Sequence, residues 1–231
     1  MIFEITSLLT IQQLCAFDKQ TMKIFPFQPR IQPMHFPVPE DAIMARLGYS
    51  RWRTRLDEEE KQRILSAVNA CFQLCRPCGC WTALPVIRQD ADRITLENGI
   101  SIASSRVSAR YPGAAWMWFG AATIGNALPE KCAAAMKAGH TAEAVIADAV
   151  GGECADGAMD FLQKQASSEL ARRGMHLAEF RFSPGYGDWC LEAQKIFFQL
   201  LPMSEMGIRL HDSMLMLPEK SVTATAGIVC G

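Results

Sequence analysis

Residues 181–188 of the chain read RFSPGYGD, and they stand where an apolar, strand-like segment gives way to a loop. The guanidinium of Arg181 is a planar fork that suits a carboxylate. Pro184 fixes the backbone, and the glycines on either side of Tyr186 permit positive φ and a close approach of a ligand to the main chain. A loop of this composition can hold a zwitterionic amino-acid group beside a flat ring. The same residues also suit a plain tight turn with a surface arginine.

The longest helical pattern lies upstream of this loop, from Thr141 to about Gly174. Its inward stripe follows one helix face and is mostly small in its first half: Ala147, Val150, Gly151, Cys154, Ala158, Phe161 and Leu162. A glycine costs about 1 kcal/mol in a helix interior. The pair Gly151-Gly152 and Gly157 therefore predict that a sheet or a ligand comes close to this helix.

Capping residues, periodicity and turn residues predict the other elements. We expect a short helix within residues 39–49, ended by Gly48, and a second helix from about Asp57 to Cys75. Strands are expected at residues 81–87, 93–96, 100–104, 114–125, 176–182 and 221–229, and further helices after Gly125 and at 191–201. The Asn98-Gly99 pair predicts a hairpin turn. Prolines at 26, 29, 33, 37 and 39 make residues 1–38 an expected irregular arm.

Composition narrows the classes of function. The 23 Lys and Arg residues nearly balance the 24 Asp and Glu residues, so the net charge of -1 creates no field that would gather nucleic acid or an acidic membrane surface. Nine cysteines, an odd number unevenly spaced, do not fit a secreted disulfide scaffold. The apolar N-terminal stretch carries Glu4 in place of a basic region and is too short to span a bilayer. We expect a cytoplasmic protein with neither nucleic-acid nor membrane partners.

Three consecutive stretches carry a family resemblance: residues 181–189 (RFSPGYGDW), 191–201 (LEAQKIFFQLL) and 207–228 (GIRLHDSMLMLPEKSVTATAGI). In order and spacing they resemble the activation, or reactivation, domain of cobalamin-dependent methionine synthase, especially its short stand-alone versions. Residues 147–163 and 116–125 resemble the long helix of that family and the strand before it. The resemblance implies one α+β domain over residues 39–231, with a curved, mostly antiparallel sheet flanked by helices, and residues 1–38 as an arm outside it.

The same resemblance implies a binding site for S-adenosylmethionine. The family holds this ligand with an Arg-x-x-Pro-Gly-Tyr loop, whose counterparts here are Arg181, Ser183, Pro184, Gly185 and Tyr186. An acid on the family's long helix also lies near the ligand and falls here on Asp156, where the family often has glutamate. Asp156 is also spaced by multiples of four from Asp148 and Asp160, so a solvated helix face is the alternative interpretation.

By resemblance, the chain would be a component of a methyltransferase that supports reductive methylation of cob(II)alamin on a separate cobalamin-binding methionine synthase subunit. A flavodoxin- or ferredoxin-type donor would supply the electron. The chain has no Asp-x-His-x-x-Gly cobalamin motif, so cobalamin would come from the partner. The reduced cobalt is the nucleophile, so the chain needs to position the methyl group but needs no catalytic base. An alternative is an S-adenosylmethionine-binding sensor or assembly factor for another corrinoid methyltransferase.

A cluster of cysteines offers a different class of function. Cys71, Cys75 and Cys78 have the C-x3-C-x2-C spacing that suits an iron-sulfur cluster, and with Cys80 they could also hold zinc. Against a metal site, Cys71 and Cys75 fall on the apolar stripe of the expected helix, where small core residues explain them.

Overall fold

The computed structural model describes residues 27–49 and 57–230. Its main sheet has the order β4-β3-β2-β5-β9-β6, with β1 also paired to β2, and each of these pairings is antiparallel. The strands are β1 Gln32–Pro33, β2 Cys78–Gln89, β3 Arg93–Leu96, β4 Ser101–Ala103, β5 Trp116–Thr123, β6 Met175–Leu177 and β9 Ser221–Cys230. A separate pair joins β7 Arg209–Leu210 to β8 Met216–Leu217. The predicted α+β class with a curved antiparallel sheet is confirmed.

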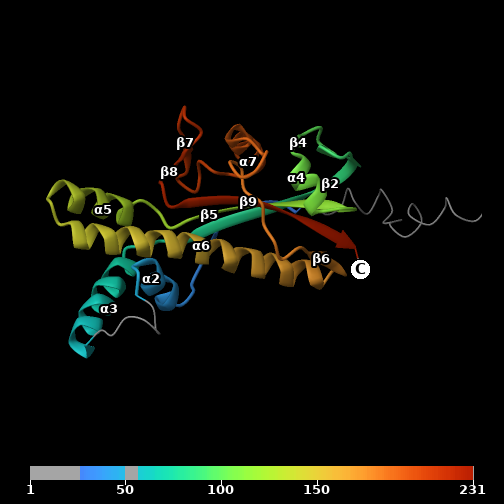
Figure 1. Cartoon of the computed structure of the whole chain (residues 1–231). Coiled ribbons are helices and arrows are strands. Elements are labelled where there is room, and N and C mark those ends of the chain that lie inside the picture. The colour runs from blue at the N-terminus through green and yellow to red at the C-terminus, as the bar shows by residue number, and fades with distance from the viewer. Residues whose placement is uncertain (1–26, 50–56, 231) are drawn as a thin grey trace, which may run out of the picture.

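Helices cover both faces of the sheet (Figure 1). The helices are α2 Glu40–Arg46, α3 Glu58–Phe72, α4 Ser105–Arg110, α5 Ala127–Lys137, α6 Thr141–Ala171 and α7 Gln194–Leu200, with a short 3-10 turn η1 Leu191–Ala193 before α7. The long helix α6 contacts β2, β5, β6 and β9 and also packs against α2, α3 and α5. In Figure 1, α4, α7 and the β7–β8 pair lie on the other side of the sheet from α6. Within the described ranges, the helices include none with the length and apolar character of a membrane span.

The central strands are buried because layers cover both faces. In β5 every residue after Trp116 is buried, as expected for a strand covered on both sides. It pairs with β2 and β9 along its whole length. A Cβ at Gly120 would overlap the ring of Trp118, so this glycine makes room for a fully buried indole. The candidate site is built on these buried, fully paired central strands.

The small residues of α6 have a different cause from the one predicted. A Cβ at Gly151 would lie 3.0 Å from the side chain of Lys220, and one at Gly157 would lie 3.3 Å from Phe36. At Gly152 the close neighbour is the guanidinium of Arg46. The expected close approach is therefore present, and α6 as a whole packs on the sheet, but at these three positions the close neighbours are long side chains from other elements.

The end of the expected irregular arm is part of the fold. Phe27 and Met34 are buried in the main core, and β1 adds to the edge of β2. The amide of Met34 donates to the carbonyl of Pro77 at 2.9 Å. Proline is tolerated in an edge strand because no ladder bond needs its missing N–H. Residues 32–34 thus join the sheet and Phe36 packs against Phe72 of α3 and Phe161 of α6, which corrects the prediction that this part of the chain lies outside the domain, while residues 1–26 lie outside the described ranges.

Candidate functional site

The loop at 181–188 begins while the chain is still hydrogen-bonded to β9. Phe182 exchanges two backbone hydrogen bonds with Thr225 of β9, at 2.9 and 2.8 Å. Gly185 has φ of 92° and Gly187 has φ of 62°, the left-handed conformation that their residue type predicted. The amide of Gly185 donates to the carbonyl of Trp189 at 2.8 Å, which closes the loop. The predicted change from strand to loop therefore occurs at this point.

Two residues fix the end of the loop. Trp189 is only 2% exposed, and its ring packs against Phe182 and Phe197 with centroid distances of 6.3 and 6.1 Å. Asp188 lies at the start of α4, where its carboxylate accepts hydrogen bonds from the hydroxyls of Ser104 and Ser105 and from the amide of Ser105 at 2.8 Å. These bonds, that of Ser104 foremost, hold the pKa of Asp188 well below its usual range. The loop is thus attached to both the core and α4.

Replacing Asp188 with asparagine is expected to lower the free energy of unfolding at neutral pH but not in strong acid. The pKa of the carboxyl is lower in the folded than in the unfolded chain. Its stabilisation is therefore complete above the unfolded value of about 3.9 and declines as the pH falls toward the folded pKa. Denaturant unfolding from neutral to acid pH measures this. Asp212→Asn, at an exposed position after β7, is the control. A wild-type advantage that stayed constant with pH would contradict the assignment.

A cavity of about 740 Å³ opens beside the loop. It is lined by Asp156, Asp160, Glu179, Phe180, Arg181, Phe182, Ser183, Tyr186, Gln194, Met216, Ser221, Val222 and Thr223. Its size is within the range of small-molecule sites. Of the residues proposed from the sequence, the cavity brings together Arg181, Ser183 and Tyr186 from the loop and Asp156 from α6, while Pro184 and Gly185 shape the loop without lining it.

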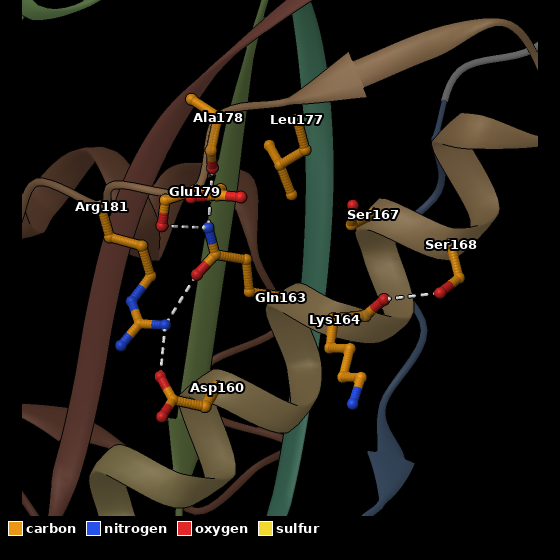
Figure 2. Close-up of a pocket in the computed structure, with 9 residues that line it drawn as sticks. All are labelled: Asp160, Gln163, Lys164, Ser167, Ser168, Leu177, Ala178, Glu179 and Arg181. Atoms are coloured by element: carbon orange, nitrogen blue, oxygen red, sulfur yellow. Dashed lines mark hydrogen bonds and ion pairs between the residues drawn. The ribbon is translucent and has the colours of Figure 1, made fainter.

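Both hydrogen bonds from the guanidinium of Arg181 to described residues come from one nitrogen, Nη1. Its Nη1 donates to Oδ1 of Asp160 at 2.6 Å and to Oε1 of Gln163 at 2.7 Å. Its side chain is 24% exposed. Figure 2 shows these contacts around a smaller cavity of about 350 Å³, which Arg181 also lines. Among the described residues, none accepts a hydrogen bond from Nε or Nη2 of Arg181, so both nitrogens are available to a carboxylate.

Asp156 is exposed but its surroundings are not those of a simple solvated face. Burial raises the pKa of this carboxyl, as does nearby Glu153, while Arg46 and Arg181 act in the opposite direction. Asp148 and Asp160 are spaced by multiples of four from Asp156 along α6. Asp148 pairs with Lys220 at 2.6 Å, and Asp160 pairs with Arg181. Asp148 and Asp160 thus form ion pairs along α6, whereas Asp156 lines the cavity without such a close pair.

The part of the cavity that β9 contributes was not predicted as part of the site. Ser221, Val222 and Thr223 of β9 line it, and the hydroxyl of Thr223 donates to Oε1 of buried Gln194 at 2.8 Å. The sequence predicted residues 221–229 as a strand but gave them no role in the site. Alternating hydroxyls at the start of this strand were the available signal, but without the sheet order they could not be placed at the same cavity as the loop.

The eight cysteines in the described part of the chain do not gather into a metal site. Cys71 and Cys75 are buried with Cys154 in the core between α3 and α6, whereas Cys80 belongs to the main core and lies 3.2 Å from the sulfur of Met206. Burial raises the pKa of Cys80 to about 12. Over residues 27–49 and 57–230, His, Cys, Asp and Glu side chains nowhere gather in a group of three or more that could hold a metal ion. The iron-sulfur or zinc interpretation of Cys71, Cys75, Cys78 and Cys80 is therefore not supported, because Cys71 and Cys75 pack in one core cluster and Cys78 and Cys80 in another.

Comparison with known proteins identifies the architecture. A scan against protein-family models and a search of curated proteins found no match. Among solved structures, the chain is similar to the crystal structure of the MetH reactivation domain bound to AdoHcy, with a TM-score of 0.61 over 87% of this chain and 79% of that one. The chain has the reactivation-domain fold. Sequence identity is 14%, so the likeness confirms the family resemblance at the level of the fold.

Proposed function

We propose that the chain binds S-adenosylmethionine in the 740 Å³ cavity and presents its methyl group to a corrinoid carried by another chain. The observation that carries this proposal is the meeting of Arg181, Ser183 and Tyr186 with Asp156 around one cavity, although 25 or more residues separate the loop from Asp156. The solved structure with the same fold holds AdoHcy, which is what S-adenosylmethionine becomes when it loses its methyl group.

The chemistry of the lining suits this ligand. Nε and Nη2 of Arg181 can bind the carboxylate of the methionine part as a fork. The ring of Tyr186, 70% exposed, offers a face for the adenine. Three acids, Asp156, Asp160 and Glu179, line the cavity against one arginine, so the local charge favours a sulfonium and an ammonium group. A cationic nucleoside with one carboxylate fits these groups better than a phosphorylated one.

The residues that line the cavity also suit a role in positioning the methyl group of the ligand. Among the described residues that line the cavity there is no histidine, cysteine or lysine, and none of its hydroxyls is hydrogen-bonded to a histidine. The partner's corrinoid, reduced by one electron from a flavodoxin- or ferredoxin-type donor, supplies the nucleophile when it is present. The sulfonium sulfur keeps the electron pair of the broken C–S bond, so no proton moves and no base is needed. The chain's part is to hold the methyl carbon in line.

Calorimetry with S-adenosylmethionine tests the binding step, and we expect saturable binding at one site per chain. Stopped-flow spectroscopy then tests the transfer step, after mixing with reductant and a cobalamin-loaded methionine synthase subunit. Appearance of the methylcobalamin spectrum supports reactivation. Binding without that spectrum would instead favour the sensor or assembly factor. Wild-type protein that neither releases heat nor gains thermal stability with the nucleoside would refute the proposal.

A further inference from the structure

Gln163 is a polar residue on the buried face of α6. Its neighbours on that face, Met159, Leu162 and Ala166, are fully buried apolar residues, and Gln163 itself is only 8% exposed. A glutamine amide has two donor hydrogens and one acceptor oxygen, and a buried polar group needs partners. Its partners therefore indicate why the helix carries this residue here.

All partners of Gln163 lie on the segment that enters the binding loop (Figure 2). Its Nε2 donates to the carbonyls of Ala178 at 2.8 Å and Glu179 at 3.0 Å, and its Oε1 accepts from Nη1 of Arg181 at 2.7 Å. One side chain thus fixes both the backbone before Arg181 and the guanidinium itself. The amide donates through Nε2 and accepts through Oε1 at the same time. Methionine can do neither, and an ionised glutamate can only accept.

This segment has left the sheet and is held by side chains: Gln163 contacts the carbonyls of Ala178 and Glu179, and the hydroxyl of Tyr111 donates to the carbonyl of Phe180 at 2.9 Å. The amide of Ala178 donates to Gly227 of β9 at 2.9 Å, and pairing with β9 resumes at Phe182. Between them the chain bends at Glu179. Asp160 contacts the same nitrogen of Arg181, but its side chain is 69% exposed, and exposed ion pairs hold geometry weakly. Gln163 is the buried contact that sets the direction of Arg181.

We propose that Gln163 is a positioning residue for the ligand's carboxylate, acting through Arg181. It accepts a hydrogen bond from Nη1 and so fixes the guanidinium at the 740 Å³ cavity, which Arg181 lines, with Nε and Nη2 left for the ligand. This inference rests on the proposed function, since it assigns a second residue to the same site. It predicts that S-adenosylmethionine affinity depends on a side chain that does not line that cavity.

The test is calorimetry with S-adenosylmethionine on Gln163→Met, a substitution of similar volume without hydrogen-bonding groups. We expect affinity to fall about tenfold, as for loss of a hydrogen bond to a charged group. Gln165→Met, two residues further along α6 at an exposed position, is the matched control and should bind within about twofold of wild type. If Gln163→Met does not fold, Gln163→Glu replaces it: its carboxylate keeps a partner for Arg181 but faces the two carbonyls, so affinity should also fall.

A double-mutant cycle separates positioning from a general structural role. In an Arg181→Ala background, Gln163→Met should weaken binding much less than it does in the wild type, because the guanidinium through which it acts is gone and only its contacts to the carbonyls of Ala178 and Glu179 remain to be lost. An equal loss in both backgrounds would overturn the inference, as would wild-type affinity in the single variant. Wild-type protein that binds no S-adenosylmethionine would reject the proposed function and this inference with it. Wild-type binding with an unaffected Gln163→Met variant would reject this inference alone.

Discussion

Arg181→Ala is expected to weaken S-adenosylmethionine binding roughly a hundredfold, from the loss of about 3 kcal/mol of charge-assisted hydrogen bonding. Nε and Nη2 of Arg181 carry no hydrogen bond to the described residues, so the ligand's carboxylate has a preformed partner. Arg181→Lys should recover only part of the affinity, since an ammonium cannot bind a carboxylate as a fork. Calorimetry on the three proteins measures the series.

The control for this series is another arginine paired with an aspartate. Arg88 lies 2.8 Å from Asp90, is 72% exposed and does not line the cavity, so Arg88→Ala should leave affinity unchanged. Thermal unfolding accompanies each titration, because Arg181→Ala also leaves Gln163 without one of its partners. An Arg181→Ala protein that stays folded and binds as tightly as wild type would show that the loop is not the binding site.

Local signals in the sequence were sufficient for most elements. Asp57 accepts a hydrogen bond from the amide of Glu60 and starts α3 as its acidic first turn predicted. Gly99 has φ of 83° in the β3–β4 turn, and Gly48 has φ of 88° just after α2. Each of these features is decided within a few residues of the chain, where capping and turn chemistry dominate. Propensity and turn chemistry are therefore reliable guides here.

Features that depend on distant contacts were predicted less well. The strand expected at 176–182 is continuous only over β6, because the carbonyls of the next three residues accept hydrogen bonds from the side chains of Gln163 and Tyr111. Residues 32–33 pair with β2, which prolines alone could not reveal. The glycines of α6 were noticed, but the side chains that approach them come from Phe36, Arg46 and Lys220.

The residues of the candidate site also fall into two groups, those that local sequence predicts and those that depend on distant contacts. The loop was recognisable because its arginine, glycines and tyrosine follow one another in sequence. Asp156 was named by resemblance, and the cavity now places it beside Arg181. Gln163 and Thr223 were not predicted, because a buried glutamine and a strand threonine resemble ordinary core or surface residues until the fold brings Gln163 into contact with Arg181 and places Thr223 at the same cavity.

Trp189→Ala is expected to lower the free energy of unfolding by about 3–5 kcal/mol, the usual cost of removing a large buried aromatic side chain. The indole is 2% exposed and packs against Phe182 and Phe197, so truncation leaves a void between them. The backbone carbonyl of residue 189, which accepts the hydrogen bond from Gly185, remains in the variant, so the loss reports the side chain alone. Denaturant unfolding monitored by circular dichroism measures the loss.

Tyr186→Ala separates folding from binding within the same loop. Tyr186 is 70% exposed, so its removal should change the free energy of unfolding by no more than about 0.5 kcal/mol. Affinity for S-adenosylmethionine should nevertheless fall, because the exposed ring is the face proposed for the adenine. The opposite pattern, a stable Trp189→Ala and an unstable Tyr186→Ala, would mean that the loop is held by contacts other than its buried tryptophan. Between them the two aromatic residues thus test whether the loop is built on the core at one end and open to a ligand at the other.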